Sequence, residues 1–109
     1  MRATIPLATL AVSLALTLAA RADAIDGDWC SAEGKHLRID GPKIAIPSGA
    51  EISGEYNRHG FRYVGPAGDP EEGQEIVMRQ QSEEEMTLRR KIGDALQPPE
   101  TWRRCQTVS

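Results

Sequence analysis

Residues 36–49, HLRIDGPKIAIPSG, decide the fold of this chain of 109 residues. The segment holds two short runs, HLRI and KIAI, in which large apolar side chains alternate with polar or small ones. Successive side chains of a β-strand point to opposite faces, so this alternation predicts strands with one buried face. The triplets DGP and PSG end the two runs with residues that favour tight turns. The segment is therefore predicted to form two strands of an antiparallel sheet.

Short alternating runs separated by Gly, Pro and Asp continue along the chain, and no helix-length amphipathic run follows residue 25. We predict an all-β fold of about eight short strands, each joined to the next by a short connection. Such a meander closes most simply into a small antiparallel barrel, with a two-layer sandwich as the alternative. The loop 93–99 has room for one helical turn at 94–96. The apolar side chains expected in the core are Trp29, Leu37, Ile39, Ile44, Ile46, Ile52, Phe61, Tyr63, Ile76, Met78, Leu88 and Trp102.

The N-terminal residues 1–24 have the features of a signal peptide. Arg2 supplies the positive start, residues 7–20 form the apolar run, and Ala22-Asp23-Ala24 is a small-x-small cleavage site. The apolar run is short for a transmembrane helix, which makes an uncleaved anchor the weaker alternative. We therefore expect an exported protein, periplasmic or secreted, with residues 25–109 as one β domain.

The composition of the mature domain excludes some classes of partner. Removing the signal peptide takes away two arginines and one aspartate, which reduces Lys+Arg from 13 to 11, reduces Asp+Glu from 16 to 15 and leaves a net charge of −4. Nucleic-acid-binding proteins usually carry a basic stripe, which this chain lacks. We expect no nucleic acid and no membrane as partners after cleavage, and a monomer that can bind another protein.

Cys30 and Cys105, the only two cysteines, are predicted to form a disulfide bond, because exported proteins fold in an oxidising compartment. Trp29 and Trp102 are placed so that, in strands, each tryptophan faces away from the neighbouring cysteine. With both tryptophans in the core, both sulfurs lie outside, where adjacent first and last strands bring them together. Closing a loop of about 76 residues is worth roughly 4 kcal/mol in the chain-entropy model.

The densest group of polar and aromatic side chains is the segment 56–63, YNRHGFRY. Arginine suits the recognition of carboxylate or phosphate groups, and tyrosine and arginine often anchor protein interfaces. Two interpretations stay open: a binding site, or an ordinary hairpin whose aromatic residues pack inward while its arginines stay in water. The candidate binding residues are Tyr56, Asn57, Arg58, His59, Arg62 and Tyr63.

The sequence offers no set of residues that defines a reaction or a metal site. His59 has no acidic residue at a spacing that implies a catalytic pair, and the nucleophile motif Gly-x-Ser-x-Gly is absent. A structural zinc site needs a full set of Cys, His or acidic ligands, whereas the disulfide would use both cysteines. We therefore expect no catalytic residue, no metal and no cofactor, and we expect His36 to be solvated.

Two further features concern charge beside or inside the predicted barrel. The loop 65–73, GPAGDPEEG, is acidic, but its spacing does not match an EF-hand loop, so we expect a solvated loop. Strict alternation puts Arg90 on the same face as the apolar Leu88, although an unpaired buried guanidinium is very costly. Either a β-bulge near 89–91 or an acidic partner at the barrel mouth would resolve this conflict.

The triplet Gly27-Asp28-Trp29 opens the first predicted strand and precedes a small disulfide-closed meander. In these features the chain resembles lipocalin-like secreted barrels, and among them the small periplasmic inhibitors of proteases and lysozyme. Metalloprotease inhibitors of this type insert an N-terminal trunk into the enzyme, but cleavage after Ala24 leaves only Ile25 and Asp26 before Gly27. The lysozyme inhibitors present a loop instead, and this mode stays open. A periplasmic family outside these groups is the alternative.

These observations lead to one expected function and two alternatives. We expect a non-enzymatic secreted binding module, with an envelope or secreted hydrolase as a partner that it inhibits. The first alternative is a small-ligand carrier that uses the barrel mouth, with Arg90 and Tyr63 as polar contacts. The second alternative is an enzyme that uses His59.

Overall fold

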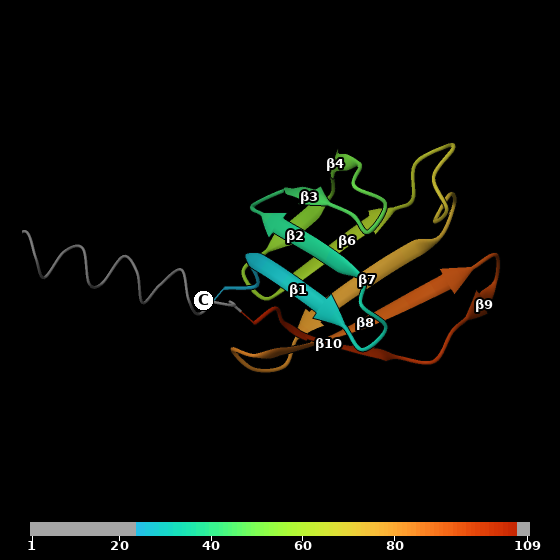
Figure 1. Cartoon of the computed structure of the whole chain (residues 1–109). Coiled ribbons are helices and arrows are strands. Elements are labelled where there is room, and N and C mark those ends of the chain that lie inside the picture. Colours follow the sequence, from blue (N-terminus) through green and yellow to red (C-terminus); the bar gives the residue numbers. More distant parts are fainter. Residues whose placement is uncertain (1–23, 107–109) are drawn as a thin grey trace, which may run out of the picture.

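The computed structural model describes residues 24–106, which contain strands and turns but no helix (Figure 1). The predicted signal peptide lies outside the described residues, except for Ala24. The strands are β1 (Gly27–Ser31), β2 (His36–Asp40), β3 (Lys43–Ala45), β4 (Glu51–Ser53), β5 (Glu55–Asn57), β6 (Gly60–Val64), β7 (Glu75–Gln80), β8 (Glu85–Ile92), β9 (Ala95–Leu96) and β10 (Glu100–Arg104).

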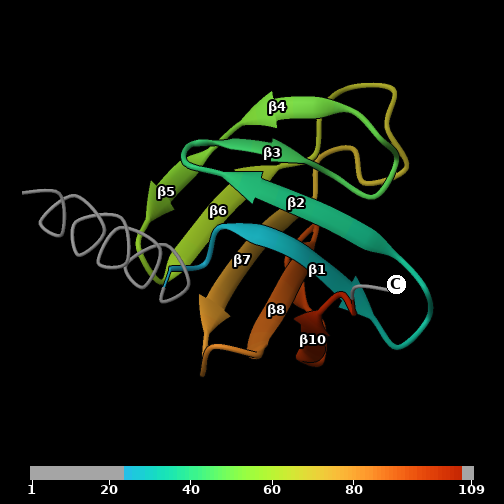
Figure 2. The same ribbon diagram turned by 60° about the vertical axis from the view of Figure 1, so that its left-hand side comes forward.

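The strands form one antiparallel sheet in the order β4-β3-β2-β1-β10-β8-β7-β6-β5, with β9 paired to β8. The sheet curls into a nearly closed barrel (Figure 2). The predicted all-β antiparallel barrel is therefore confirmed. The strands number ten rather than about eight, because residues 51–57 divide into two strands and residues 95–96 pair with β8 instead of forming a helical turn.

Gly54 lies where the two ends of the sheet meet. It separates β4, which pairs with β3, from β5, which pairs with β6. A Cβ atom at this position would lie 2.5 Å from the main-chain oxygen of Arg62 and 2.5 Å from the Phe61 ring, so a glycine is required for this approach. Its N–H donates to the Pro42 oxygen at 2.9 Å. The segment around Gly54 thus contacts both ends of the sheet and nearly closes the barrel.

The first and last strands lie side by side, as predicted, and a disulfide bond joins them. Cys30 and Cys105 are bonded with a Cα–Cα distance of 5.0 Å. Trp29 and Trp102 are fully buried, whereas both cysteines are only half-buried on the outer side. The open edges of the sheet lie at β4 and β5. The bond therefore reinforces the β1–β10 pair, which connects the two halves of the chain, and not the gap in the barrel.

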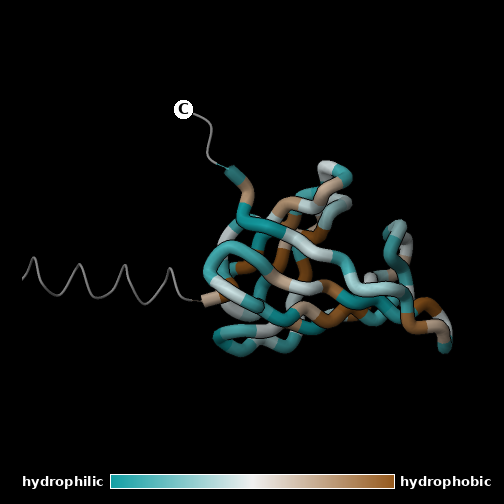
Figure 3. Tube along the Cα trace, turned by 90° about the horizontal axis from the view of Figure 1, so that it is seen from below, coloured by the Kyte–Doolittle hydropathy of each residue, from teal (hydrophilic) through white to brown (hydrophobic). Residues whose placement is uncertain are grey.

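The interior of the barrel is filled by apolar side chains. Hydrophobic and hydrophilic residues alternate along the strands (Figure 3). All the predicted core residues are buried except Ile52, which is half-buried because β4 has only one neighbouring strand. Ile25 and Met86 are also fully buried, in addition to the predicted core residues. With these side chains in place, the barrel is a packed core rather than an open container.

The far end of β8 extends past the barrel in a hairpin with β9 (Figure 1). Ile92 and Leu96 in this hairpin are 46% and 59% exposed. Between β9 and β10, Pro98 and Pro99 interrupt the pairing with β8, since proline has no N–H to donate to a ladder. The hairpin therefore adds exposed apolar surface outside the main core.

Candidate functional site

Arg90 points into one mouth of the barrel, where carboxylates surround it. Its Nε lies 2.7 Å from an oxygen of Glu100, and its Nη1 lies 3.1 Å from an oxygen of Glu71 and 3.0 Å from the amide oxygen of Gln74. The β7–β8 register continues without interruption through residues 89–91, so no bulge turns the side chain away in that pair. The second of the two expected solutions, an acidic partner at the barrel mouth, is the one that forms.

Tyr63 and Trp102 extend this network into the core. The Tyr63 hydroxyl donates to Glu71 at 2.6 Å, and the Trp102 Nε1 donates to Glu100 at 3.1 Å. Burial raises the pKa of Tyr63, and its hydrogen bond to the Glu71 carboxylate adds to that shift. The hydrogen-bonding groups of Arg90 and Tyr63 are therefore paired with residues of the protein itself. The candidate binding residue Tyr63 therefore lies in the core, apart from the exposed residues of its segment.

The acidic loop 65–73 differs from the expected solvated loop at one residue. Glu71 is only 9% exposed and turns inward to the network at the barrel mouth. Asp69 on the same loop accepts a hydrogen bond from the Ser48 hydroxyl, which ties the loop to the turn before β4. In residues 24–106, no three His, Cys, Asp or Glu side chains come together in the manner of metal ligands.

Arg104 closes the opposite mouth. Its Nη2 donates to the Ala24 oxygen at 2.7 Å, its Nη1 to the Asp26 oxygen at 2.5 Å and its Nε to the Glu83 oxygen at 2.8 Å. Burial lowers the pKa of this guanidinium. A Cβ atom on Gly27, whose φ is +118°, would lie 2.8 Å from Nη1, which explains the glycine two residues before the buried tryptophan. No local sequence pattern indicates this role of Arg104, because its partners Ala24, Asp26 and Glu83 lie far from it along the chain.

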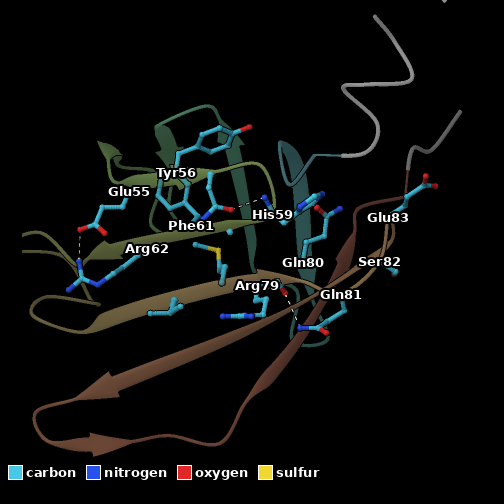
Figure 4. A pocket seen from close by; sticks show the side chains of 14 residues that line it. Glu55, Tyr56, His59, Phe61, Arg62, Arg79, Gln80, Gln81, Ser82 and Glu83 are labelled. Carbon is cyan, nitrogen blue, oxygen red and sulfur yellow. Dashed lines mark hydrogen bonds and ion pairs between the residues drawn. The ribbon is translucent and has the colours of Figure 1, made fainter. Parts of the chain in front are cut away.

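A groove of about 780 Å³ lies on the outside of this end of the barrel, along β5, β6, β7 and the β7–β8 turn (Figure 4). It gathers four of the six predicted binding residues, Tyr56, Asn57, His59 and Arg62, whereas Arg58 and Tyr63 do not line it. Its lining residues are Glu55, Tyr56, Asn57, His59, Gly60, Phe61, Arg62, Val77, Met78, Arg79, Gln80, Gln81, Ser82 and Glu83.

The β5–β6 turn places the polar groups at one end of the groove. The Asn57 side chain accepts a hydrogen bond from the His59 N–H at 2.9 Å, which is a side-chain substitute for a backbone turn. The Tyr56 hydroxyl donates to Asp26, and its ring meets the Phe61 ring edge-on at 6.4 Å. These contacts fix the turn without using the imidazole of His59, which makes no hydrogen bond to the described residues.

The charged and polar groups of the groove differ in how well they are satisfied. Arg62 forms ion pairs with Glu75 and Glu55, and its hydrogen bond to Glu75 is the main reason that its pKa is raised. The amide oxygen of Gln80 is buried and has no hydrogen-bond partner within residues 24–106. An unpaired buried acceptor costs free energy, and this atom lies beneath the groove rather than on its surface. The sequence pattern could not reveal Gln80 or Arg79, because both lie on a strand far from the segment 56–63.

His36 lies on the outer face of β2, where its side chain is 53% exposed, as expected for a solvated residue. Its Nε2 lies 2.9 Å from a carboxylate oxygen of Asp28, and the other oxygen of Asp28 binds Arg38 at 2.7 Å. Cross-strand pairing of β1 with β2 brings the three side chains together. This is a surface ion-pair cluster, and such pairs contribute little to stability.

The chain matches no protein-family model, no curated protein and no solved structure. Within residues 24–106, no helix has the length and apolar character that a membrane span requires.

Proposed function

We propose that this protein is an exported, non-enzymatic module that binds another protein through the groove along β5, β6 and β7. One observation carries the proposal: the barrel interior is packed with side chains, whereas the outer groove collects Tyr56, Asn57, His59 and Arg62. Tyrosine and arginine are enriched among the residues that dominate protein interfaces. The site therefore lies on the outer surface of the barrel.

The arrangement at the barrel mouth supports this proposal over the small-ligand carrier. A carrier needs a cavity with polar groups that can turn to a ligand. Arg90 instead directs its donors to Glu71, Gln74 and Glu100, and Tyr63 directs its hydroxyl to Glu71. A ligand at this mouth would have to replace these contacts.

The partner that we propose is an envelope or secreted hydrolase, which the module inhibits by covering its active-site region. Residues 57–59 are exposed, and a turn that is stiffened by the Asn57 side chain loses little conformational entropy when it binds. The fixed turn could therefore enter an enzyme cleft without a large ordering cost. His59 at its tip would then be a contact residue and not a general base.

Capture from an extract of the envelope and secreted fraction tests the proposal. The oxidised protein is immobilised, and the retained proteins are compared for wild type and for the groove variant, His59→Ala combined with Arg62→Ala. The control combines His36→Ala with Arg38→Ala, a histidine and an arginine that contact Asp28 away from the groove. We expect the control to retain the same partner as wild type and the groove variant to retain at least about fivefold less, which corresponds to roughly 1 kcal/mol.

The retained protein is then assayed for hydrolytic activity with and without added module. Lower activity in the presence of the wild type supports inhibition. Equal capture by the groove variant and the wild type would show that the groove is not the binding site. Turnover of a substrate by the module itself, lost in His59→Gln, would overturn the non-enzymatic proposal.

A further inference from the structure

The outer face of β6, β7 and β8 carries a group of basic side chains. Cross-strand pairing places Arg62, Val77 and Arg89 in one row across the three strands. Arg79 lies two residues after Val77 on β7, and Lys91 lies two residues after Arg89 on β8. Residues two apart on a strand point to the same face. The four basic residues therefore share one surface, which we call the basic face.

Three cations of the basic face have no acidic partner in residues 24–106. No carboxylate of the described residues lies within ion-pair distance of Arg79, Arg89 or Lys91. Among these residues, Arg89 donates only to the main-chain oxygen of Gln97, at 3.3 Å. Arg62 differs, since Glu55 and Glu75 bind it. The chain as a whole has a net charge of −3. An acidic protein thus keeps a cluster of unneutralised cations on one face.

Exposed apolar side chains lie among these cations. Val77 is 42% exposed at the centre of the face, and Val64 is 48% exposed on β6. Pairing places Val64, Glu75 and Lys91 in a second row. Leu96, which is 59% exposed, pairs with Lys91 at the end of this row. The face therefore offers both charge and apolar surface, in alternating positions.

We propose that the basic face binds an acidic, extended segment of the partner protein, in which a carboxylate recurs at every second residue. This inference rests on the proposed function and adds the chemistry of the partner. The carboxylates of such a segment share one face, on which they would pair with Arg79, Arg89 and Lys91 and lay their methylene groups against Val77. Residues two apart in an extended chain are about 6.6–6.8 Å apart, which matches the spacing of the side chains along β7 and β8.

A protein segment suits this face better than an anionic bilayer does. The net charge of −3 would repel a broad anionic surface, whereas a single segment contacts the protein at the basic face alone.

The test titrates the ¹⁵N-labelled, disulfide-bonded protein with a ten-residue peptide of alternating Glu and Val, followed by NMR. Peptides of alternating Gln and Val and of alternating Lys and Val serve as charge controls. We expect amide shifts from the acidic peptide that concentrate on residues 62–64, 75–79 and 87–91. Raising the salt concentration from 50 to 300 mM should weaken binding by about fivefold or more, because exposed charge pairs are screened.

Two double variants, each of which removes two positive charges, distinguish binding at the basic face from attraction of the peptide to the protein as a whole. Arg79→Gln with Arg89→Gln removes two cations of the basic face, and Lys35→Gln with Lys43→Gln removes two exposed lysines elsewhere. We expect about three- to tenfold weaker binding for the first pair and less than twofold for the second. Equal weakening by both pairs, or no shifts at millimolar acidic peptide, would overturn the proposal.

Vesicles of phosphatidylglycerol test whether the basic face binds an anionic membrane instead of an acidic protein segment. The proposal would be rejected if the protein cosediments with these vesicles, if Arg79→Gln with Arg89→Gln abolishes the cosedimentation, and if the acidic peptide does not bind. This result would assign the basic face to a membrane. If wild type and the variant Arg79→Gln with Arg89→Gln capture equal amounts of a partner from the extract, the proposed function survives and this inference fails. If no partner is captured, the proposed function fails, and the peptide titration still decides this inference.

Discussion

The guanidinium of Arg104 lies over the ring of Trp29, with its central carbon 4.1 Å from the ring centroid. The two residues face each other across β1 and β10, the first and last strands. The same guanidinium donates to the carbonyls of Ala24, Asp26 and Glu83. A single side chain therefore holds the N-terminal segment, the first strand and the β7–β8 turn in place.

Arg104→Ala is expected to lower the free energy of unfolding by about 2–4 kcal/mol, because it removes the cation–π contact and leaves carbonyls without donors. Arg104→Lys should recover only part of this loss, since an ammonium lacks the planar fork that reaches several carbonyls. Urea unfolding followed by tryptophan fluorescence measures both. Arg103→Ala is the control, because its side chain is 69% exposed, and it should change little. Similar losses for positions 103 and 104 would contradict the role of Arg104.

Replacing Arg90 tests the network at the other mouth. Arg90→Met is expected to cost about 3–5 kcal/mol, because Glu71 and Glu100 keep their charges without the cation between them. The neighbouring Arg89 points outward, so Arg89→Met is a matched control that should stay close to wild type. Thermal unfolding of both variants gives the comparison. A tolerated Arg90→Met would show that the network does not stabilise the barrel.

Stability should fall at acid pH through Glu100. Burial opposes its ionisation, but hydrogen bonds from Arg90 and Trp102 outweigh burial and lower the pKa of Glu100. A carboxyl with a lowered pKa stabilises the fold above its unfolded-state pKa of about 4.3, and this stability is lost as the pH falls through the folded-state pKa. Urea unfolding between pH 2 and pH 7 should show this loss below about pH 4. In Glu100→Gln the decline should be shallower.

Stability should also fall at alkaline pH through Tyr63. Its pKa is raised by burial and by the hydrogen bond to Glu71, so the folded protein keeps the phenol neutral. The contribution of Tyr63 to the free energy of unfolding is fully present below the unfolded-state pKa of about 10. It decreases above this pH, where the tyrosine ionises only in the unfolded chain. Unfolding measured from pH 8 to pH 11 should show the decrease, and Tyr63→Phe should reduce its slope. An unchanged slope in that variant would contradict this assignment.

Removal of the Cys30–Cys105 bond should lower the free energy of unfolding by roughly 4 kcal/mol, because the unfolded chain gains the entropy of an open loop. Dithiothreitol treatment and the double variant Cys30→Ala, Cys105→Ala should agree. Intact mass before and after reduction confirms that the bond was present. The Arg104–Trp29 contact should persist in the reduced protein if enough of it stays folded, since it does not depend on the sulfurs. An unchanged melting temperature after reduction would contradict the expected role of the bond.

The sequence predicted the barrel, the disulfide bond and nearly all of the core, because strand alternation depends on near neighbours along the chain. The position of Trp29 beside Cys30 is an example, since adjacent residues must face opposite sides of a strand. Strand boundaries were harder to predict. Gly54 divides two strands because of a close approach to Phe61 and Arg62, and no local pattern reveals a contact of that kind.

The candidate site was only partly predictable for the same reason. The segment 56–63 was identified from its composition, and four of its six chosen residues line the groove. Gln80 and Arg79 join them only through the pairing of β6 with β7. Strand alternation predicts Tyr63 in the core, and it is buried there, whereas its candidate role as a binding residue does not bring it to the groove. Its hydroxyl donates to the inward-facing Glu71, which lies in a loop that the sequence indicated to be solvated.

The disulfide between Cys30 and Cys105 also determines how the protein responds to mechanical force. The bond encloses a sequence separation of 75 residues, which includes every strand from β2 to β10. A force applied to the two ends of the chain would be borne by the disulfide bond, and the strands inside the loop would not be stretched. In a pulling experiment the oxidised protein should extend only by its segments outside the loop. Reduction should release the added contour length of the enclosed residues.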